Sequence, residues 1–439
     1  MSEVTLSPIP YDGGSLMPMN GAGICRLSAG KYFTVHAQKN PNYIFGGIWS
    51  VSGEGSSSPS ATSVRTQVLT EMSAPWNNMG SNDVGFYVNC EKITENVVLI
   101  ERRMEISNTA MCDFFAVKID ESTNQMTMVG DTQTYYTARD EHYSPPQDGQ
   151  LNRTCLKNIG DGEVLAVGFL HSSPLSYPMT INTTGVRFVY NSINESLSSS
   201  VIFADITCAI RPNEAHLGNQ AVFNIKECSE QDGHYFVTCL LGERYGNHGS
   251  QYSDDYRIGV TGKSAIYSGS GSSWSRVQVN HNGNRTLGNP NDKAPFMTLP
   301  RTSTQYYNFG LDGIMAKNSD SSWSSYAPVK GAWNNHPYYA GFHSLGNDDP
   351  STFVTVFSQP ALGTVAQIHT NSSFSLRVGK IPNFGSTAVS SAATAYRDKS
   401  FTGAHCIKGE SSFEKFSEAT IMQYGYQGNN FKLVYINLD

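Results

Sequence analysis

Residues 89–101 read NCEKITENVVLIE: a cysteine, a short polar turn and then a run of β-branched and aliphatic residues. The same order returns in ICRLSAGKYFTVH at 24–36, in TCLKNIGDGEVLAVGF at 154–169 and in ECSEQDGHYFVTCL at 227–240. It returns once more in HCIKGESSFEKFSEATIMQY at 405–424. A metal site, a disulfide framework and a structural repeat are the three explanations for such a recurrence.

The spacing of these cysteines favours a structural repeat. The successive spacings between Cys25, Cys90, Cys155 and Cys228 are 65, 65 and 73, and a near-constant period of this kind in a β-rich chain is typical of repeat architectures. None of the eight cysteines forms a C-x-x-C pair, and no histidine stands at zinc-finger spacing. We therefore interpret these four residues and Cys406 as reduced, buried and equivalent packing positions. We predict no metal site and no cofactor.

Composition and turn spacing predict an all-β chain. Gly, Tyr and Phe are abundant, with 40, 23 and 21 residues. Few windows show helical periodicity, and turn residues separate many short apolar runs. Phe115, Val117 and Ile119 stand at every second position, which fits one face of a half-buried strand. Three or four strands in each unit of about 65 residues are typical of a propeller blade. We predict a single β-propeller domain over residues 1–439 with seven blades; six and eight blades are the nearest alternatives.

The repeat also predicts where each blade begins. The expected blades are 25–89, 90–154, 155–227, 228–297, 298–344, 345–405, and 406–439 together with 1–24. Because the last unit is short, the segment EVTLSPIPY at 3–11 is expected to pair with it as a strand and to close the ring. Closure removes the exposed sheet edges that an open array would leave.

Charge and hydropathy exclude several classes of partner. Only 15% of the residues are charged and the net charge is -7, whereas a nucleic-acid-binding protein normally carries a basic patch. No window approaches 18 consecutive apolar residues, so no membrane insertion is expected. The first residues show no basic region followed by an apolar core, and we predict no secretory signal.

Aromatic residues supply the candidate contact surface. All five tryptophans stand beside turn residues, and they either pack at blade edges or present flat faces to a glycan or a partner protein. The densest group predicts contact through Trp274, Trp323, Trp333, His336, Tyr338 and Tyr339.

Catalytic motifs are sparse. The chain contains no G-x-S-x-G elbow, no H-E-x-x-H and no P-loop. The charged stretch ARDEHYSPP at 138–146 is interpreted as a solvated loop, with a ligand or ion site as the alternative. Asn347, Asp348 and Asp349 form either an ordinary turn or a calcium site. We predict no catalytic residue and no enzymatic activity.

In composition and expected architecture the whole chain resembles bacteriophage virion proteins, in particular the propeller components of tails, nozzles and receptor-binding appendages. The resemblance implies a non-catalytic structural or adhesive protein, present in several copies in the virion. Its partners would be other virion proteins and a host surface glycan or protein. The alternative is a glycan-processing enzyme or a lectin on a propeller scaffold, which requires paired carboxylates or an arginine cluster in its site.

Overall fold

The structure is a computed structural model that describes residues 2–16, 22–72, 87–106, 109–138, 154–174, 179–210, 221–228, 230–241, 263–281, 297–300, 302–304, 306–310, 313–317, 323–328, 338–344, 352–359, 373–380, 394–402, 404–408, 421–425 and 430–435. In these ranges the elements are strands, apart from one short 3-10 helix at Tyr11–Gly13. No helix in the described ranges is long and apolar enough to cross a membrane. The all-β prediction is confirmed.

The chain divides into two compact units. Unit 1 comprises Met1–Asn219 and Tyr424–Leu433, and unit 2 comprises Gln220–Gln423 and Val434–Asp439.

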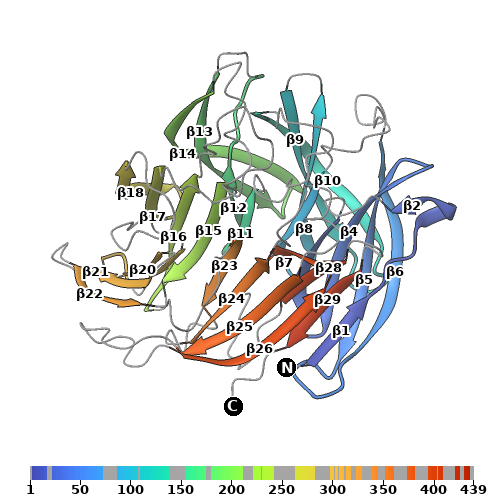
Figure 1. Cartoon of the computed structure of the whole chain (residues 1–439). Helices are drawn as coiled ribbons and strands as arrows, with labels where there is room; N and C mark the ends of the chain where they lie inside the picture. The colour runs from blue at the N-terminus through green and yellow to red at the C-terminus, as the bar shows by residue number, and fades with distance from the viewer. Residues whose placement is uncertain are drawn as a thin grey trace, which may run out of the picture. The chain divides into compact units, whose positions relative to one another are not determined.

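Unit 1 contains three sheets of hydrogen-bonded antiparallel neighbours, here named sheets 1, 2 and 3 (Figure 1). Sheet 1 holds β3 (Ala22–Ser28), β4 (Lys31–Lys39), β5 (Tyr43–Ser52) and β6 (Ser60–Glu71), with the short β2 (Ser15–Leu16) also paired to β4. Sheet 2 holds β7 (Tyr87–Thr94), β8 (Val97–Ile106), β9 (Thr109–Ile119) and β10 (Met126–Ala138). Sheet 3 holds β11 (Cys155–Gly160), β12 (Glu163–Gly168), β13 (Met179–Asn191) and β14 (Ser196–Ile210).

Unit 2 contains three further four-stranded sheets. Sheet 4 holds β15 (Ala221–Cys228), β16 (Gln231–Leu241), β17 (Lys263–Ser270) and β18 (Ser273–His281). Sheet 5 holds β19 (Met297–Pro300), β20 (Tyr306–Gly310), β21 (Gly313–Lys317) and β22 (Trp323–Pro328). Sheet 6 holds β23 (Tyr338–Ser344), β24 (Thr352–Gln359), β25 (Ser373–Lys380) and β26 (Thr394–Thr402).

Sheet 7 combines strands from both ends of the chain. Its order is β1 (Ser2–Leu6), β29 (Phe431–Tyr435), β28 (Ile421–Gly425) and β27 (Ala404–Lys408). The N-terminal strand is therefore hydrogen-bonded beside a C-terminal strand, as Figure 1 shows for β1 and β29. The first strands of the other sheets begin at Ala22, Tyr87, Cys155, Ala221, Met297 and Tyr338. The predicted blade bounds stay a prediction. That the seven sheets form one domain stays a prediction.

Turn chemistry explains how the first two strands of a sheet connect. In sheet 3, Gly160 pairs with Glu163, so Asp161 and Gly162 alone form the loop. Both have positive φ, 50° and 77°, which matches a type I′ turn and its preference for Asp-Gly. The same dipeptide recurs as Asp232-Gly233, which lies within β16 (Gln231–Leu241).

Bulges interrupt the last strand of several sheets. In sheet 1, Ile48 pairs with Arg65 and Trp49 with Ser63, which leaves Val64 as the extra residue. In sheet 4 the same irregularity leaves Val277 unpaired between its neighbours. Both valines are exposed, at 47% and 36%. A bulge twists an edge strand, and this disfavours pairing of the edge with another chain.

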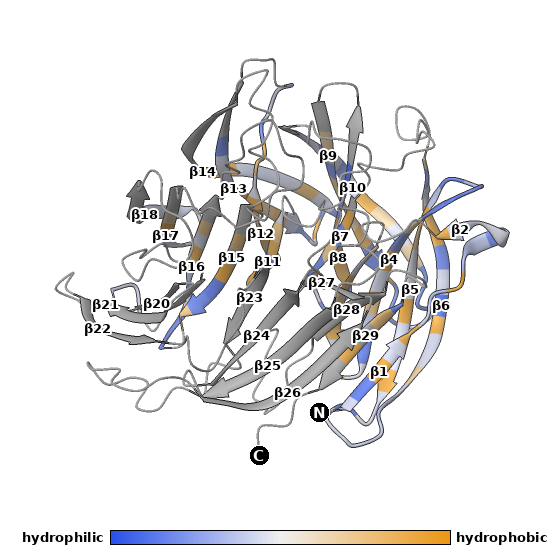
Figure 2. Cartoon of the chain, viewed as in Figure 1, coloured by the Kyte–Doolittle hydropathy of each residue, from blue (hydrophilic) through white to orange (hydrophobic). Residues whose placement is uncertain are grey.

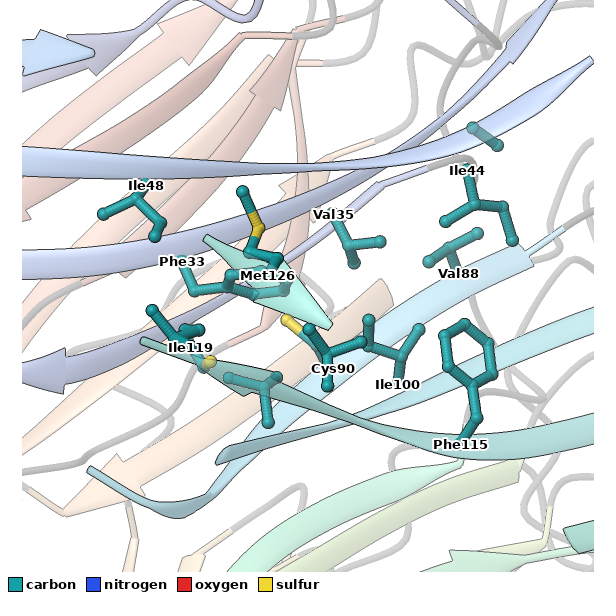
Figure 3. Packing of buried hydrophobic residues seen from close by; sticks show 14 of the residues in the cluster. Phe33, Val35, Ile44, Ile48, Val88, Cys90, Ile100, Phe115, Ile119 and Met126 are labelled. Carbon is teal, nitrogen blue, oxygen red and sulfur yellow. The ribbon is translucent and has the colours of Figure 1, made fainter. Parts of the chain in front are cut away.

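Apolar side chains fill the space between neighbouring sheets of unit 1. Figure 2 shows apolar residues recurring along these strands, and Figure 3 shows the cluster between sheets 1 and 2. Phe33 and Val35 of β4 lie in this cluster with Val88, Cys90 and Ile100 of sheet 2, and all five are fully buried. A second cluster joins sheets 2 and 3 and includes Ile93, Leu99, Phe114, Leu156, Ala166 and Phe188.

The structural repeat of unit 1 has a constant period in residue number. The second strands β4, β8 and β12 begin at Lys31, Val97 and Glu163, so the residue number advances by 66 from each start to the next. Each of these residues pairs across the turn with the end of the first strand of its sheet. We call two residues equivalent when their numbers differ by 66 in this part of the chain.

Hydrogen bonds between first strands follow the same period. Lys92 Nζ of β7 donates to the carbonyl oxygen of Leu27 on β3, at 2.9 Å. Asn158 Nδ2 of β11 donates to the carbonyl oxygen of Ile93 on β7, at 2.8 Å. Lys92 and Asn158 are equivalent, and so are Leu27 and Ile93. Sheets 2 and 3 are thus each fastened to the preceding sheet by a side chain at the same position.

The cysteines do not follow this period. Cys25 lies on β3 and Cys90 on β7, and both contribute to the cluster between sheets 1 and 2 from opposite sides. Because their spacing is 65, Cys90 is equivalent to Ile24, and a shift of one residue along a strand reverses the face. The interpretation of these two cysteines as equivalent packing positions is therefore wrong.

The remaining cysteines of the repeat also lie on first strands, not before them. Cys155 opens β11 and is half-buried, Cys228 ends β15 and is buried, and Cys406 lies within β27. The side chain of Cys406 is outside the described residues. Among the described residues the free cysteines are Cys25, Cys90, Cys112, Cys155, Cys228 and Cys239.

Candidate functional site

Polar and charged side chains gather at one end of the interface between sheets 2 and 3. Along most of this interface the facing residues are apolar. At the end where β8 finishes and β11 starts, Glu101 and Arg103 of β8 lie with Asn89 of β7 and with Thr154, which immediately precedes β11. They are buried, with exposures of 0% for Glu101, 9% for Arg103 and 4% for both Asn89 and Thr154. We name these four residues the polar end.

Hydrogen bonds connect the polar end across the two sheets. The hydroxyl of Thr154 donates to Glu101 Oε1 at 2.7 Å. Asn89 Nδ2 donates to the carbonyl oxygen of Thr154 at 3.2 Å. Asn89 Oδ1 in turn accepts the backbone N–H of Cys90 at 2.9 Å, which orients the amide. The carboxyl group is therefore held by a chain of contacts that begins on the backbone of β7.

Equivalent positions in the other repeats are apolar. Glu101 is equivalent to Val35 in β4 and to Val167 in β12, and both valines are fully buried. Arg103 is likewise equivalent to Ala37 and to Phe169. The first and third repeats thus show that apolar side chains suffice for packing at these positions. A buried carboxylate and a buried guanidinium carry a desolvation cost that apolar residues do not.

Charge at the polar end acts on a neighbouring thiol without making it reactive. Cys112 of β9 pairs directly with Arg103. Burial raises the pKa of the Cys112 thiol well above its usual range, and the charge of Arg103 only partly opposes this. Since the thiolate is the nucleophilic form, Cys112 stays a protonated, inert side chain.

A separate ion pair lies close by in sheet 2. Arg102 donates from Nε and Nη2 to Asp113 Oδ2, at 3.2 and 2.9 Å, and Thr134 Oγ1 donates to Asp113 Oδ1 at 2.7 Å. The guanidinium also lies 5.7 Å from the ring centre of Phe115, which belongs to the cluster between sheets 1 and 2. Its partners are complete, so we interpret this pair as structural.

The aromatic residues expected to form a contact surface lie on three sheets. Trp274 of β18 donates its indole N–H to the carbonyl oxygen of Gly271 at 2.9 Å and covers Gly269, so it packs on its own hairpin. Trp323 opens β22 of sheet 5, and Tyr338 opens β23 of sheet 6, followed by Tyr339. Trp333 and His336 lie outside the described residues. A role of these residues in binding stays a prediction.

The other sequence candidates fall on parts that the structure does not describe. Residues 139–150, with the charged stretch, and residues 345–350, with the possible calcium turn, lie outside the described ranges. Within those ranges no group of three or more His, Cys, Asp or Glu side chains is placed to hold a metal ion.

Sequence reasoning missed the polar end. Glu101 and Arg103 lie at the end of the segment NVVLIERR. Polar residues that follow an apolar run in this way usually indicate an ordinary strand end. The available signal was an alignment of the repeats with residue numbers offset by 66, which sets Glu101 between Val35 and Val167. The cysteine spacing of 65 concealed that alignment.

Comparisons with known proteins give no family assignment. No family model matches the chain, and no curated protein matches it. Among solved structures, an α-L-arabinanase of Penicillium chrysogenum complexed with arabinobiose is 12% identical, with a TM-score of 0.40 over 83% of this chain and 95% of that one. The α-L-arabinofuranosidase Arb93A of Fusarium graminearum is 11% identical, with a TM-score of 0.41 over 87% and 98%. The WD40 β-propeller domain of Doa1 is 10% identical, with a TM-score of 0.36 over 98% and 97%.

These comparisons correct two predictions. Glycoside hydrolases are among the similar structures, so the comparisons favour the alternative, a glycan-processing protein, over the predicted non-catalytic virion component without enzymatic activity. At such identities and TM-scores the likeness carries neither a reaction nor a substrate over to this chain. The predicted partners and location stay predictions.

Proposed function

We propose that the chain is a seven-bladed β-propeller that processes a neutral glycan, with the polar end as its site. The architectural part rests on the strand pairing: the described strands fall into seven sheets, and β1 completes sheet 7. On this proposal each sheet is one blade, and the N-terminal strand closes the ring.

The observation that supports the functional part is the buried pair of Glu101 and Arg103 at positions that are apolar in both flanking repeats. Burying charged side chains carries a desolvation cost that well-packed apolar residues do not, so packing alone does not account for these two residues. Buried polar groups that lower stability, at positions that an apolar residue could fill, are concentrated at functional sites.

The residue types of the polar end determine the ligand class. A carboxylate, a guanidinium, a hydroxyl and an amide together donate and accept hydrogen bonds, which is what a hydroxyl-rich sugar requires. One acidic and one basic side chain balance each other, so the described groups offer no net charge to an anionic or cationic ligand. A carboxyl group is also the group that exchanges a proton or stabilises positive charge in glycoside hydrolysis.

Glu101 is fully covered in this ligand-free structure. A sugar can contact Glu101 only if a group that covers this side chain is displaced. The assay therefore has to detect turnover or binding directly. Purified protein is incubated at pH 4–8 with neutral arabinan, xylan and galactan oligosaccharides and with galacturonan as the anionic comparison. Release of reducing ends measures hydrolysis, and calorimetry measures binding.

Glu101→Gln keeps the size of the side chain and removes its acid–base chemistry. We expect it to lower kcat/KM on the neutral substrate by about 100-fold or more. The matched control is Glu195→Gln, which removes an exposed carboxylate that pairs with Lys118 at 2.5 Å, and it should leave turnover unchanged. Binding without turnover would identify a lectin, and full activity of Glu101→Gln would contradict the proposed site.

The double variant Glu101→Val/Arg103→Ala gives sheet 2 the residues that the first repeat carries at these positions. We expect its free energy of unfolding to be unchanged or raised by about 1–4 kcal/mol, while activity is lost. Urea unfolding monitored by circular dichroism measures the stability. A loss of several kcal/mol would show that the pair serves the fold, and would contradict a functional reason for it.

A further inference from the structure

The residue that immediately precedes β11 differs in chemistry from its equivalents. Thr154 is equivalent to Val88 in sheet 2 and to Ala22 in sheet 1, both of which are fully buried. Among the three repeats of unit 1 that the structure describes, this position carries a hydroxyl only in the third, and there it lies beside Glu101. From this coincidence and from the contacts below, we propose that Thr154 is a positioning residue that orients the Glu101 carboxyl group for the reaction. The inference rests on the proposed function.

Thr154 is held from two directions. Its hydroxyl donates to Glu101 Oε1 at 2.7 Å, and its carbonyl oxygen accepts from Asn89 Nδ2 at 3.2 Å. Asn89 is equivalent to Gly23, so the first repeat has no side chain that could make the second contact. The hydroxyl of Thr154 and the amide of Asn89 thus meet at the interface between sheets 2 and 3, where the carboxyl group lies.

A glycine of sheet 3 leaves room for the Thr154 side chain. A Cβ added at Gly168 would lie 3.2 Å from Thr154 Oγ1 and 3.4 Å from its Cα. Contacts near 3.2 Å are tighter than ordinary van der Waals packing, so a methyl group at position 168 would require the hydroxyl to shift by a few tenths of an ångström. Gly168 pairs with Thr184 at the end of β12, and the three heavy atoms nearest to such a Cβ all belong to Thr154.

The hydrogen bond from Thr154 has a chemical consequence for Glu101. A donor to a carboxylate oxygen fixes the plane of the carboxyl group and favours its ionised form. Loss of the donor makes protonation of Glu101 easier, so the acidic limb of the pH–rate profile moves to higher pH. A residue that serves only packing would lower stability without moving that limb.

Two variants of Thr154 separate these roles. Thr154→Val keeps the shape and removes the hydroxyl, and Thr154→Ser keeps the hydroxyl and removes a methyl group. We expect Thr154→Val to lower kcat/KM by about 10-fold or more and to move the acidic limb upward, while Thr154→Ser restores both. Gly168→Ala, which displaces the hydroxyl without removing it, should resemble Thr154→Val.

A second measurement needs no substrate. The carboxyl carbon resonance of Glu101, followed against pH in the ligand-free protein, should titrate about one pH unit higher in Thr154→Val and return in Thr154→Ser. A titration that does not move in Thr154→Val overturns the proposal, whatever the activity assay shows. If Thr154→Val is unstable, the same titration in Gly168→Ala decides.

The outcomes also distinguish this inference from the proposed function. If Glu101→Gln abolishes turnover but Thr154→Val leaves rate and pH profile intact, Thr154 has no positioning role and the proposed function stands. If no glycan is turned over yet the Glu101 titration moves as expected, the contact is real but the proposed function fails, and the positioning role fails with it.

Discussion

His36 is a buried histidine whose surroundings are aromatic. Its ring lies 5.1 Å from Phe45, nearly parallel to it, and 5.3 Å from Phe431 of β29. Neither ring nitrogen has a hydrogen-bond partner in the described part of the chain. Burial without a compensating charge lowers the pKa of His36 from 6.5 to about 3. The imidazole is therefore neutral in the folded protein under all mild conditions.

This depressed pKa predicts an acid-sensitive stability. Above pH 6.5 both folded and unfolded chains hold His36 neutral, so it contributes no pH dependence. Between pH 6.5 and about 3 only the unfolded chain binds the proton, and the free energy of unfolding falls by about 1.4 kcal/mol per pH unit from this residue. Urea unfolding at pH 7 and pH 5 should show about 2 kcal/mol more loss in the native sequence than in His36→Phe.

The comparison of the two sequences at both pH values isolates His36 from other titrating groups. At pH 7 the variant should be as stable as the native sequence or more stable, because phenylalanine removes two buried nitrogen atoms that lack partners. Equal acid sensitivity in both proteins would contradict the neutral buried state of His36.

Residue identity alone gave a misleading alignment of the repeats. The strand around Phe115 and the Asp161-Gly162 turn follow from local chemistry, and both were predictable. The strand is buried on both faces, however, because Phe114 and Ala116 pack in the cluster between sheets 2 and 3, so the prediction of a half-buried strand is wrong. The cysteines were not reliable markers, since a free cysteine packs as a small apolar residue and can stand on either face of a strand. The true period becomes visible only through backbone pairing, and with it the contrast of Glu101 with Val35 and Val167.

At the scale of elements, one side chain fastens the segment between β1 and β2. Gln38 of β4 is fully buried and accepts the backbone N–H of Tyr11 on Oε1 at 2.7 Å. Its amide nitrogen donates to the carbonyl oxygens of Tyr11 and Pro41, at 2.9 and 3.2 Å. A single glutamine thereby provides the pairing that a neighbouring strand would otherwise supply to this segment.

Gln38→Met should loosen the N-terminal segment. Methionine fills a similar volume but satisfies none of the three backbone groups, so we expect the free energy of unfolding to fall by about 2 kcal/mol or more. Limited proteolysis should then cut the chain near Tyr11 before the rest of the protein unfolds. The control is Gln125→Met at an exposed position, where a change within about 0.5 kcal/mol is expected. An uncut segment would show that β1 and β2 hold it without Gln38.

The first strands of the sheets were not recognised from the sequence pattern. The cysteine segments were interpreted as turns preceding a strand, yet β3, β7 and β11 are strands that carry these residues. Each contains charged or amide side chains, such as Lys92 and Asn158, which weaken the apolar alternation in sequence. Lys92 and Asn158 donate to carbonyl oxygens of the preceding first strand, a tertiary contact that no local pattern reveals.

At the scale of the whole molecule, the two ends of the chain depend on each other. β1 is the end strand of sheet 7 and lies beside β29, so the first residues complete a sheet whose other strands all come from the C-terminal end of the chain. Val4 and Leu6 of β1 are buried, at 7% and 0% exposure, whereas Ile9 just beyond the strand is 75% exposed. A free N-terminal tail would show no such contrast between adjacent positions.

Removal of residues 1–12 should therefore destabilise the protein far from the N-terminus. The deletion exposes β29 as an unpaired edge, and such edges promote association between chains. We expect a lower melting temperature together with concentration-dependent aggregation in light scattering. Leu6→Ala tests the packing without deleting the strand and should cost about 2–5 kcal/mol, while Ile9→Ala on the same segment should stay within about 0.5 kcal/mol. A deletion variant that melts like the native protein would leave sheet 7 complete without β1, and the proposal that the N-terminal strand closes a seven-bladed ring would have to be abandoned.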